Sequence, residues 1–285
     1  MRCAGVLLVL LLSPAVSACG GSGQPAKAGK VVVAAFYPLA WAAEQIGGET
    51  VDVVNLTPPG AEPHDIELSP GDMQIAHDAD LVLYVGEGFM SALEDAVQGR
   101  DNAVDLLAGE PLLAGGGGRG VDPHVWLDPK RYAALVVKIA AALGEPEAGA
   151  ALSGRLEHLD GELRRGLDDC KRHEIVTSHA AFGYLAGAYG LEQIALTGLS
   201  PEAEPSPRAL EALVDQVEKR GATTVFFETL VSPRLAETVA REAGVDTAAL
   251  DPIEGLDEEE LARGADYFSV MRENLAALRK ALGCR

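Results

Sequence analysis

The sequence predicts an α/β protein of two βα lobes, each with a mainly parallel sheet, joined by a single long connecting helix. Short β-branched runs alternate with helical patterns from Lys30 onward, as in proteins built from successive βα units. A long helical stretch with charges of both signs, residues 147–170, interrupts this alternation, which then begins again. The composition, 48% hydrophobic and 23% charged, provides a packed core and excludes intrinsic disorder.

The first predicted lobe covers residues 31–146. We expect its strands at 31–35, 51–56, 81–85 and from Val104, and its helices at 38–46, 72–79, 89–98 and 128–143. The last helix starts at Asp128-Pro129 and is broken by Gly144-Glu145-Pro146. Residues 113–120 are rich in glycine, which predicts a mobile surface segment before that helix.

The connecting helix, residues 147–170, leads to a second predicted lobe at 171–285. Opposite charges along this helix are typical of a solvated connector rather than of a core helix. The expected strands of the second lobe are 174–177, 193–196, 224–227 and 247–250, and its helices are 207–220, 233–242, 267–282 and one from Ala180. No sequence repeat relates the lobes, so only their architecture is repeated.

Residues 1–18 have the features of a signal peptide. The apolar run from Cys3 to Leu12 is too short to span a bilayer. The Ser-Ala pair directly before Cys19 resembles a bacterial lipobox, in which the cysteine is lipidated and begins the mature chain. Residues 19–30 are rich in Gly, Ser and Ala and predict a flexible tether. We therefore expect an extracytoplasmic chain, anchored to the bacterial cell membrane by lipid at Cys19; an ordinary cleaved signal is the alternative.

The charge of the chain is strongly negative. There are 43 Asp and Glu residues against 23 Lys and Arg, which gives a net charge of -20 and a pI of about 4.6. This balance argues against nucleic-acid binding, because neutralising phosphates requires positive patches. It mildly favours cations, although solubility alone also explains an acidic surface. We expect a monomer.

Two cysteines, Cys170 and Cys284, are left when the signal peptide is removed and Cys19 is lipidated. Outside the cytoplasm a disulfide between them is allowed, and it would fasten the last helix to its own half of the molecule. A loop of this length predicts a stabilisation of roughly 4 to 5 kcal/mol. Two free cysteines are the alternative.

Three of the six histidines lie in similar positions. His64 and His179 follow predicted strands, and His124 lies just before a helix. Ligands of open α/β sheets bind outside the carboxyl ends of strands, so these side chains can converge, and Asp251 ends a further strand. Three imidazoles and one carboxylate form a closed tetrahedral set that suits Zn²⁺.

The other histidines, and the aromatic residues near the candidate ligands, have less specific interpretations. His77, His158 and His173 are expected at the surface. Four aromatic residues could either line the metal pocket or belong only to the core: Phe36, Tyr37, Trp126 and Phe182.

Six segments resemble one family when they are read together. They are PPGAEPHDIELSP around His64, DPHVWLDP around His124, TSHAAFGYLA around His179, EAEPSP at residues 202–207, FFETLVSPRLAETVAREAGV from Phe226 and LDPIEGL from Leu250. In this order they resemble the metal-specific substrate-binding lipoproteins of ABC transporters, of the ZnuA/TroA-like kind. The resemblance extends over essentially the whole mature chain.

This resemblance implies a binding protein rather than an enzyme, with the metal held between the lobes. Its ligands would be His64 and His124 from the first lobe and His179 and Asp251 from the second. Relatives that carry manganese commonly have a carboxylate at the third position, so His179 points to zinc. The implied partners are an ABC permease and its ATPase.

Several alternatives remain open from the sequence. Glu62 or a water molecule could take the place of Asp251, and Glu204 could orient a ligand histidine. The cargo could be Mn²⁺ or Fe²⁺, and the protein could instead be a zinc hydrolase or a surface adhesin. Residues 113–120 also lack the His- and acid-rich composition that zinc-uptake members often have before the second ligand, which argues against a metal-gathering role for this segment.

Overall fold

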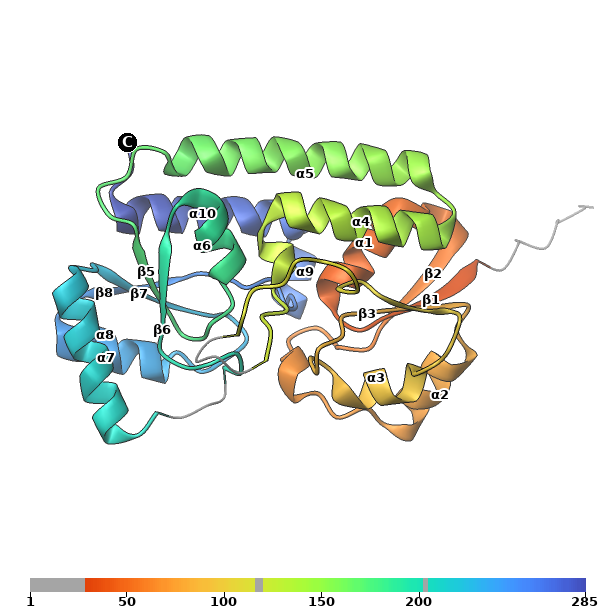
Figure 1. The fold of residues 1–285 in the computed structure, drawn as a ribbon, viewed down its shortest axis with the longest axis horizontal. Helices are drawn as coiled ribbons and strands as arrows, with labels where there is room; N and C mark the ends of the chain where they lie inside the picture. The colour runs from red at the N-terminus through yellow and green to blue at the C-terminus, as the bar shows by residue number, and fades with distance from the viewer. Residues whose placement is uncertain (1–28, 116–119, 202–204) are drawn as a thin grey trace, which may run out of the picture.

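The computed structural model describes residues 29–115, 120–201 and 205–285. The predicted signal peptide, residues 19–28 of the predicted tether with Cys19, residues 116–119 of the glycine-rich segment and Glu204 therefore lie outside the described residues. Within these ranges the chain forms two parallel four-stranded sheets flanked by helices, which confirms the predicted α/β class with two lobes (Figure 1). The structure places a strand within one residue of every expected position.

The N-terminal lobe is built on a parallel sheet of order β2-β1-β3-β4. Val32 of the central strand lies opposite Val53 on one side and Leu81 on the other, and its side chain is fully buried. Helix α1 covers one face of the sheet, while α2 and α3 lie on the other (Figure 1). The elements are β1 (Lys30–Ala34), α1 (Tyr37–Gly47), β2 (Val51–Asn55), α2 (Pro70–Asp78), β3 (Leu81–Tyr84), α3 (Ser91–Val97) and β4 (Ala103–Asp105).

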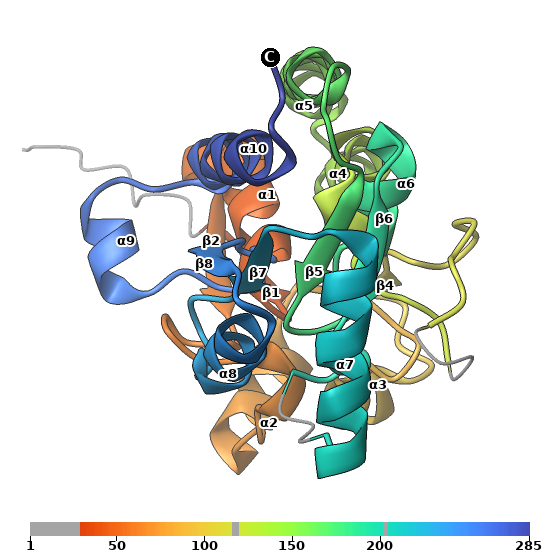
Figure 2. The same cartoon turned by 90° about the vertical axis from the view of Figure 1, so that its left-hand side faces the viewer.

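The C-terminal lobe repeats this arrangement with the order β6-β5-β7-β8. Helix α9 was not expected; it is a short acidic helix whose N-terminus is capped by Asp257, which exchanges hydrogen bonds with Glu260. It projects from the body of the lobe (Figure 2). The elements are β5 (Glu174–Thr177), α6 (Gly183–Tyr189), β6 (Glu192–Ala195), α7 (Pro207–Arg220), β7 (Thr224–Phe227), α8 (Arg234–Ala243), β8 (Asp246–Ala249), α9 (Glu258–Ala262) and α10 (Tyr267–Leu282).

Two consecutive helices connect the two sheets along the chain and form an antiparallel pair. They are α4 (Pro129–Leu143) and α5 (Pro146–Leu167). Gly144, with φ of 83°, ends α4 in the left-handed region and lets the chain reverse. A Cβ on Gly149 would lie 2.3 Å from that of Ala140, so only glycine allows the two helices to approach this closely. Helix α5 runs over both lobes in the position expected for the connector, and α10 lies beside it (Figures 1 and 2).

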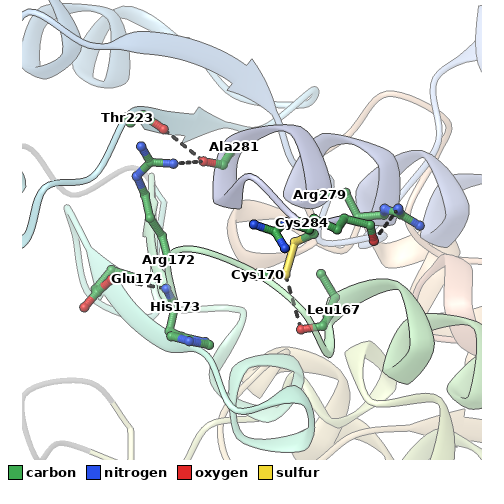
Figure 3. Close-up of a disulfide and its surroundings, with 10 residues drawn as sticks. Leu167, Cys170, Arg172, His173, Glu174, Thr223, Arg279, Ala281 and Cys284 are labelled. Carbon is green, nitrogen blue, oxygen red and sulfur yellow. Dashed lines mark hydrogen bonds between the residues drawn. A yellow bond between two sulfur atoms is a disulfide. The ribbon is translucent and has the colours of Figure 1, made fainter.

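A disulfide joins Cys170, which follows α5, to Cys284, which follows α10 (Figure 3). Backbone hydrogen bonds from Lys171 and Arg172 to the carbonyl of Leu282 support the same junction. The bridge therefore ties the end of the connecting helix to the end of the last helix. None of the helices in the described ranges is long and apolar enough to cross a membrane.

A buried aromatic cluster fills the junction of the lobes below α4 and α10. Trp41 of α1 stacks on Tyr132 and Tyr267, at ring-centroid distances of 6.2 and 5.4 Å, and meets the edge of Phe268. These residues come from α1, α4 and α10, so one apolar core joins both halves of the chain. The junction is therefore packed like a protein interior.

Candidate metal centre

Four side chains from both lobes converge between the sheets: His64, His124, His179 and Glu254. Each offers one donor atom, and these atoms all lie within 4.8 Å of one another. The structure thus brings together the three histidines that the sequence singled out. The carboxylate beside them is that of Glu254, not that of Asp251.

His64 lies in the loop after β2, on a single 3-10 turn, Pro63–Asp65. The carboxylate of Glu62 accepts a hydrogen bond of 3.0 Å from the backbone N–H of His64, so Glu62 caps this turn. The imidazole packs edge-on against Phe89, with ring centroids 4.6 Å apart. With 11% of its side chain exposed, His64 is the only one of the four groups that reaches solvent.

His124 is fully buried and is held by a carboxylate two residues earlier. Asp122 Oδ1 lies 2.7 Å from Nδ1 of His124 and also accepts a 2.9 Å hydrogen bond from its backbone N–H. This contact leaves Nε2 of the ring to face the cluster. A carboxylate on the outer nitrogen of an imidazole is the arrangement that orients histidines for metal binding.

His179 is held in the same manner from a different strand. It follows β5, and Oε1 of Glu228, which follows β7, lies 2.7 Å from its Nδ1. The backbone carbonyl of His179 accepts hydrogen bonds from Thr177 Oγ1 and Gln193 Nε2. Nε2 of the fully buried ring again points to the cluster. His64 has no carboxylate in the equivalent position among the described residues.

Glu254 reaches the site from a sharp turn after β8. Asp251 anchors the start of this turn, because its carboxylate accepts hydrogen bonds from Thr229 Oγ1 at 2.7 Å and from the backbone N–H of Ile253 at 2.6 Å. Ile253 has φ of 55°, a rare conformation for a β-branched residue. The turn directs Glu254 toward the histidines and keeps Asp251 occupied elsewhere.

The charges of the cluster stabilise one another. Burial favours neutral Glu254, but the neighbouring histidines outweigh burial and hold the pKa of its carboxyl well below the ordinary value. Burial also disfavours a charged His179, yet its hydrogen bond to Glu228 and the charge of Glu254 raise its pKa to about 10. The pKa of His124 is raised as well, because Asp122 and Glu254 outweigh its burial. The carboxyl of Glu254 is therefore held in its ionised form, the form that can bind a cation.

Three atoms of the cluster are buried and form no well-directed hydrogen bond among the described residues: Oε2 of Glu254, and Nε2 of His124 and of His179, which lie 2.9 and 3.5 Å from Oε1 of Glu254. Buried polar atoms are normally satisfied, so such a group needs an explanation. A cation at the common centre would satisfy all of them at once. The donor set, three imidazole nitrogens and a carboxylate, is one that suits Zn²⁺.

The other residues discussed from the sequence fall into two groups, aromatic residues beside the metal centre and histidines at the surface. Trp126 and Phe36 are fully buried, and their ring centroids lie 4.8 Å apart. The ring centroid of Trp126 also lies 5.2 Å from that of His124. These two aromatic residues therefore belong to the core and line the site as well. Phe89, which touches His64, was not expected. His77, His158 and His173 are exposed.

Asp122, Glu228 and Glu254 were not among the residues predicted from the sequence. Asp122 could have been found two residues before His124, in the segment DPHVWLDP. Glu228 directly follows β7, at the same edge of the sheet as His179. Glu254 lies within LDPIEGL, three residues beyond Asp251, so only the geometry of the turn distinguishes the two carboxylates.

The fold and the site together define the class of two-lobed metal-binding proteins, with candidate ligands from both lobes. The family model described as "ZnuA: Zinc-uptake complex component A periplasmic" matches residues 32–281, and the chain belongs to this family. The family is one of binding components of metal uptake, not of enzymes.

Individual relatives agree with this assignment. The zinc-binding protein AdcA of Streptococcus pyogenes serotype M1 is 36% identical over 287 aligned residues; the match covers 88% of this chain but only 56% of the relative, so the chain spans little more than half of its length. The Zn(II)-bound ZnuA-like domain of Streptococcus pneumoniae AdcA is 37% identical with a TM-score of 0.76, covering 89% of this chain and 99% of that domain. The laminin-binding protein Lmb of Streptococcus agalactiae, titled bifunctional with adhesin and metal-transporting activity, is 28% identical with a TM-score of 0.80, covering 89% of this chain and 100% of Lmb.

Proposed function

We propose that this chain captures Zn²⁺ outside the cytoplasm and delivers it to an ABC permease driven by a cytoplasmic ATPase. The observation that carries the proposal is the convergence of His64, His124, His179 and Glu254 from both lobes, with buried donor atoms that form no well-directed hydrogen bond outside the cluster. The zinc-binding names of the relatives support the same cargo.

The donor set favours zinc over manganese or iron as cargo. Three of the four donors are imidazole nitrogens, which suit Zn²⁺, whereas Mn²⁺ prefers oxygen ligands. All four are protein groups, so a tetrahedral ion would have no open position for a water nucleophile. The site is thus suited to hold an ion rather than to catalyse hydrolysis.

Capture between two lobes gives the permease a way to recognise the loaded protein. An ion bound by groups of both lobes stabilises the arrangement in which those groups meet. A permease that binds this arrangement more tightly than the empty one will select loaded protein. Because α5 is continuous and the lobe junction is packed, we expect metal release to cause a small change in the angle between the lobes and local loop movement. We do not expect the lobes to open widely.

The anchor is the second part of this proposal. Lipid at Cys19 would hold the protein at the outer face of the cell membrane, with residues 20–30 as the tether. The Ser-Ala-Cys sequence at residues 17–19 supports it. A Cys19→Ala variant is expected to leave the membrane fraction, and one that stays there in full would contradict the anchor.

The cargo is tested by metal content and competition. The purified protein is expected to contain close to one zinc per chain, which excess Mn²⁺ does not displace. His124→Ala is expected to lose most of its affinity, whereas His77→Ala, on the exposed face of α2, is expected to match the wild type. Manganese or iron in the purified protein would change the cargo; equal zinc binding by the His124→Ala variant would refute the site.

Adhesion is a second candidate function, favoured by the likeness to Lmb. We propose binding to immobilised laminin as its test. Saturable laminin binding by both the zinc-loaded and the zinc-free protein would support an adhesive role in addition to transport. Laminin binding no stronger than that of an unrelated acidic protein would refute the adhesive role.

A further inference from the structure

Trp126 connects the segments that carry two of the four candidate ligands. It is fully buried and lies two residues after His124, on the short turn Val125–Leu127 that leads into α4. Its indole Nε1–H donates a buried hydrogen bond of 2.8 Å to the carbonyl of Pro252. Pro252 precedes Glu254 by two residues and belongs to the C-terminal lobe. A single side chain thus joins the His124 segment of one lobe to the Glu254 turn of the other.

The position of Trp126 is itself fixed on several sides. Its backbone carbonyl accepts a hydrogen bond of 2.6 Å from the hydroxyl of Tyr267 at the start of α10. Its ring packs edge-on against Phe36 at 4.8 Å and Phe89 at 5.9 Å. Phe89 in turn contacts the ring of His64. Trp126 therefore contacts the surroundings of three candidate ligands at once.

The turn that carries Glu254 depends on such outside support. Its residue Ile253 is in the left-handed region, a conformation that costs free energy and persists only when the surroundings hold it. On the N-terminal side, Asp251 exchanges hydrogen bonds with Asn274 of α10. On the C-terminal side, Leu256 accepts a backbone hydrogen bond of 3.1 Å from Gly60, in the loop before His64. Between these anchors, the Trp126 indole is the side chain that holds Pro252.

We propose that Trp126 is a positioning residue of the metal site, whose indole N–H fixes the Glu254 turn against His124 and so sets the affinity and coordination geometry of the bound ion. This inference rests on the proposed function, because it presumes that the four side chains bind a metal. Loss of the N–H leaves the buried carbonyl of Pro252 without its donor, and the turn can then relax away from the site. Changes in such outer contacts typically lower metal affinity by about 10- to 100-fold.

The test compares Trp126→Phe with Trp41→Phe in the full chain. Both replace a buried tryptophan of the lobe junction, but the aromatic contacts of Trp41 are with Tyr132, Tyr267 and Phe268, none of which is a candidate ligand. Trp126→Phe is expected to lower the Zn²⁺ affinity by about 10- to 100-fold and to change the visible absorption of bound Co²⁺, a reporter of coordination geometry. Trp41→Phe is expected to lower the melting temperature but to leave affinity and spectrum unchanged.

A second variant separates the hydrogen bond from the packing of the ring. In a Trp41→Phe background, the one remaining tryptophan can be replaced by benzothienylalanine, in which sulfur stands in for the N–H with little change of shape. The affinity is expected to fall as in Trp126→Phe. Wild-type affinity and Co²⁺ spectrum in this protein would overturn the inference, even if Trp126→Phe failed to fold. A wild type that bound no zinc would refute the proposed function instead.

Discussion

The carboxylate of Glu254 lies 2.9 Å from Nε2 of His124, although one residue belongs to the C-terminal lobe and the other to the N-terminal lobe. The same oxygen, Oε1, lies 3.3 Å from Nε2 of His64 and 3.5 Å from Nε2 of His179. The four candidate ligands, drawn from both lobes, are thus gathered around one carboxylate. A single cation at this centre would lie within reach of donor atoms from both lobes.

The first prediction concerns the identity of the carboxylate ligand. Glu254→Gln keeps the shape of the side chain but removes its charge, so the Zn²⁺ affinity is expected to fall by more than about 100-fold, beyond the usual effect of an outer partner. Asp251→Asn is the matched control, because the asparagine amide can still accept a hydrogen bond from the backbone N–H of Ile253 and can donate one to the hydroxyl of Thr229. The Zn²⁺ affinity of Asp251→Asn is expected to stay within about 3-fold of that of the wild type, a smaller change than the loss of an outer contact to a ligand causes. The opposite order in a competitive titration would assign the ligand to Asp251.

The second prediction concerns the carboxylates behind the histidines. Asp122→Asn and Glu228→Gln each weaken the contact that orients a ligand imidazole, and each is expected to lower zinc affinity by about 10- to 100-fold. Asp78→Asn serves as the control, because Asp78 makes the same type of contact to His77, at 2.9 Å, on the exposed end of α2. Isothermal titration with a competing chelator measures all three. Equal affinities would mean that packing alone orients the rings.

Much of the fold could be predicted because its signals are local. Strand β1 contains the apolar run Val31–Ala34, in which Val32, Val33 and Ala34 are buried as a parallel sheet requires, and Asp128-Pro129 and Gly144 mark the ends of α4. Helix α9 was missed since its five residues, Glu258–Ala262, show no apolar face. Its start depends on capping by Asp257, a signal that the hydrophobic pattern does not contain.

The site was less predictable than the fold, for a physical reason. The chain has only six histidines, so His64 and His179 after strands and His124 before a helix stood out, and the family resemblance selected the same three. Carboxylates are common in this acidic chain, and Asp251 and Glu254 are both plausible by position. The choice between them depends on a turn with a left-handed Ile253 and on hydrogen bonds to Thr229, which no sequence pattern specifies.

The third prediction concerns the disulfide. Cys170→Ser together with Cys284→Ser opens a loop with a sequence separation of 114, which is expected to lower the free energy of unfolding by roughly 4 to 5 kcal/mol. The bridge lies at the outer end of α5 and α10, so zinc affinity is expected to stay unchanged (Figures 1 and 3). Chemical denaturation with and without a reductant measures the first effect and a metal titration the second. A reduced protein as stable as the oxidised one would show that the bridge does not stabilise the fold.

The fourth prediction concerns pH and Asp251. Burial is the main cause that raises the pKa of this carboxyl from 3.8 to about 7, so between these values the folded chain holds a proton that the unfolded chain has lost. Stability from this group is therefore present at low pH and is lost as pH rises through 7; between pH 5 and pH 8 the loss amounts to about 3 kcal/mol. Asp251→Asn does not titrate, so the stability of the wild type relative to this variant, both metal-free, is expected to decrease by that amount over this range. Denaturation at several pH values measures the difference. A difference that stays constant between pH 5 and pH 8 would show that the carboxyl of Asp251 is ionised in the folded chain over this whole range.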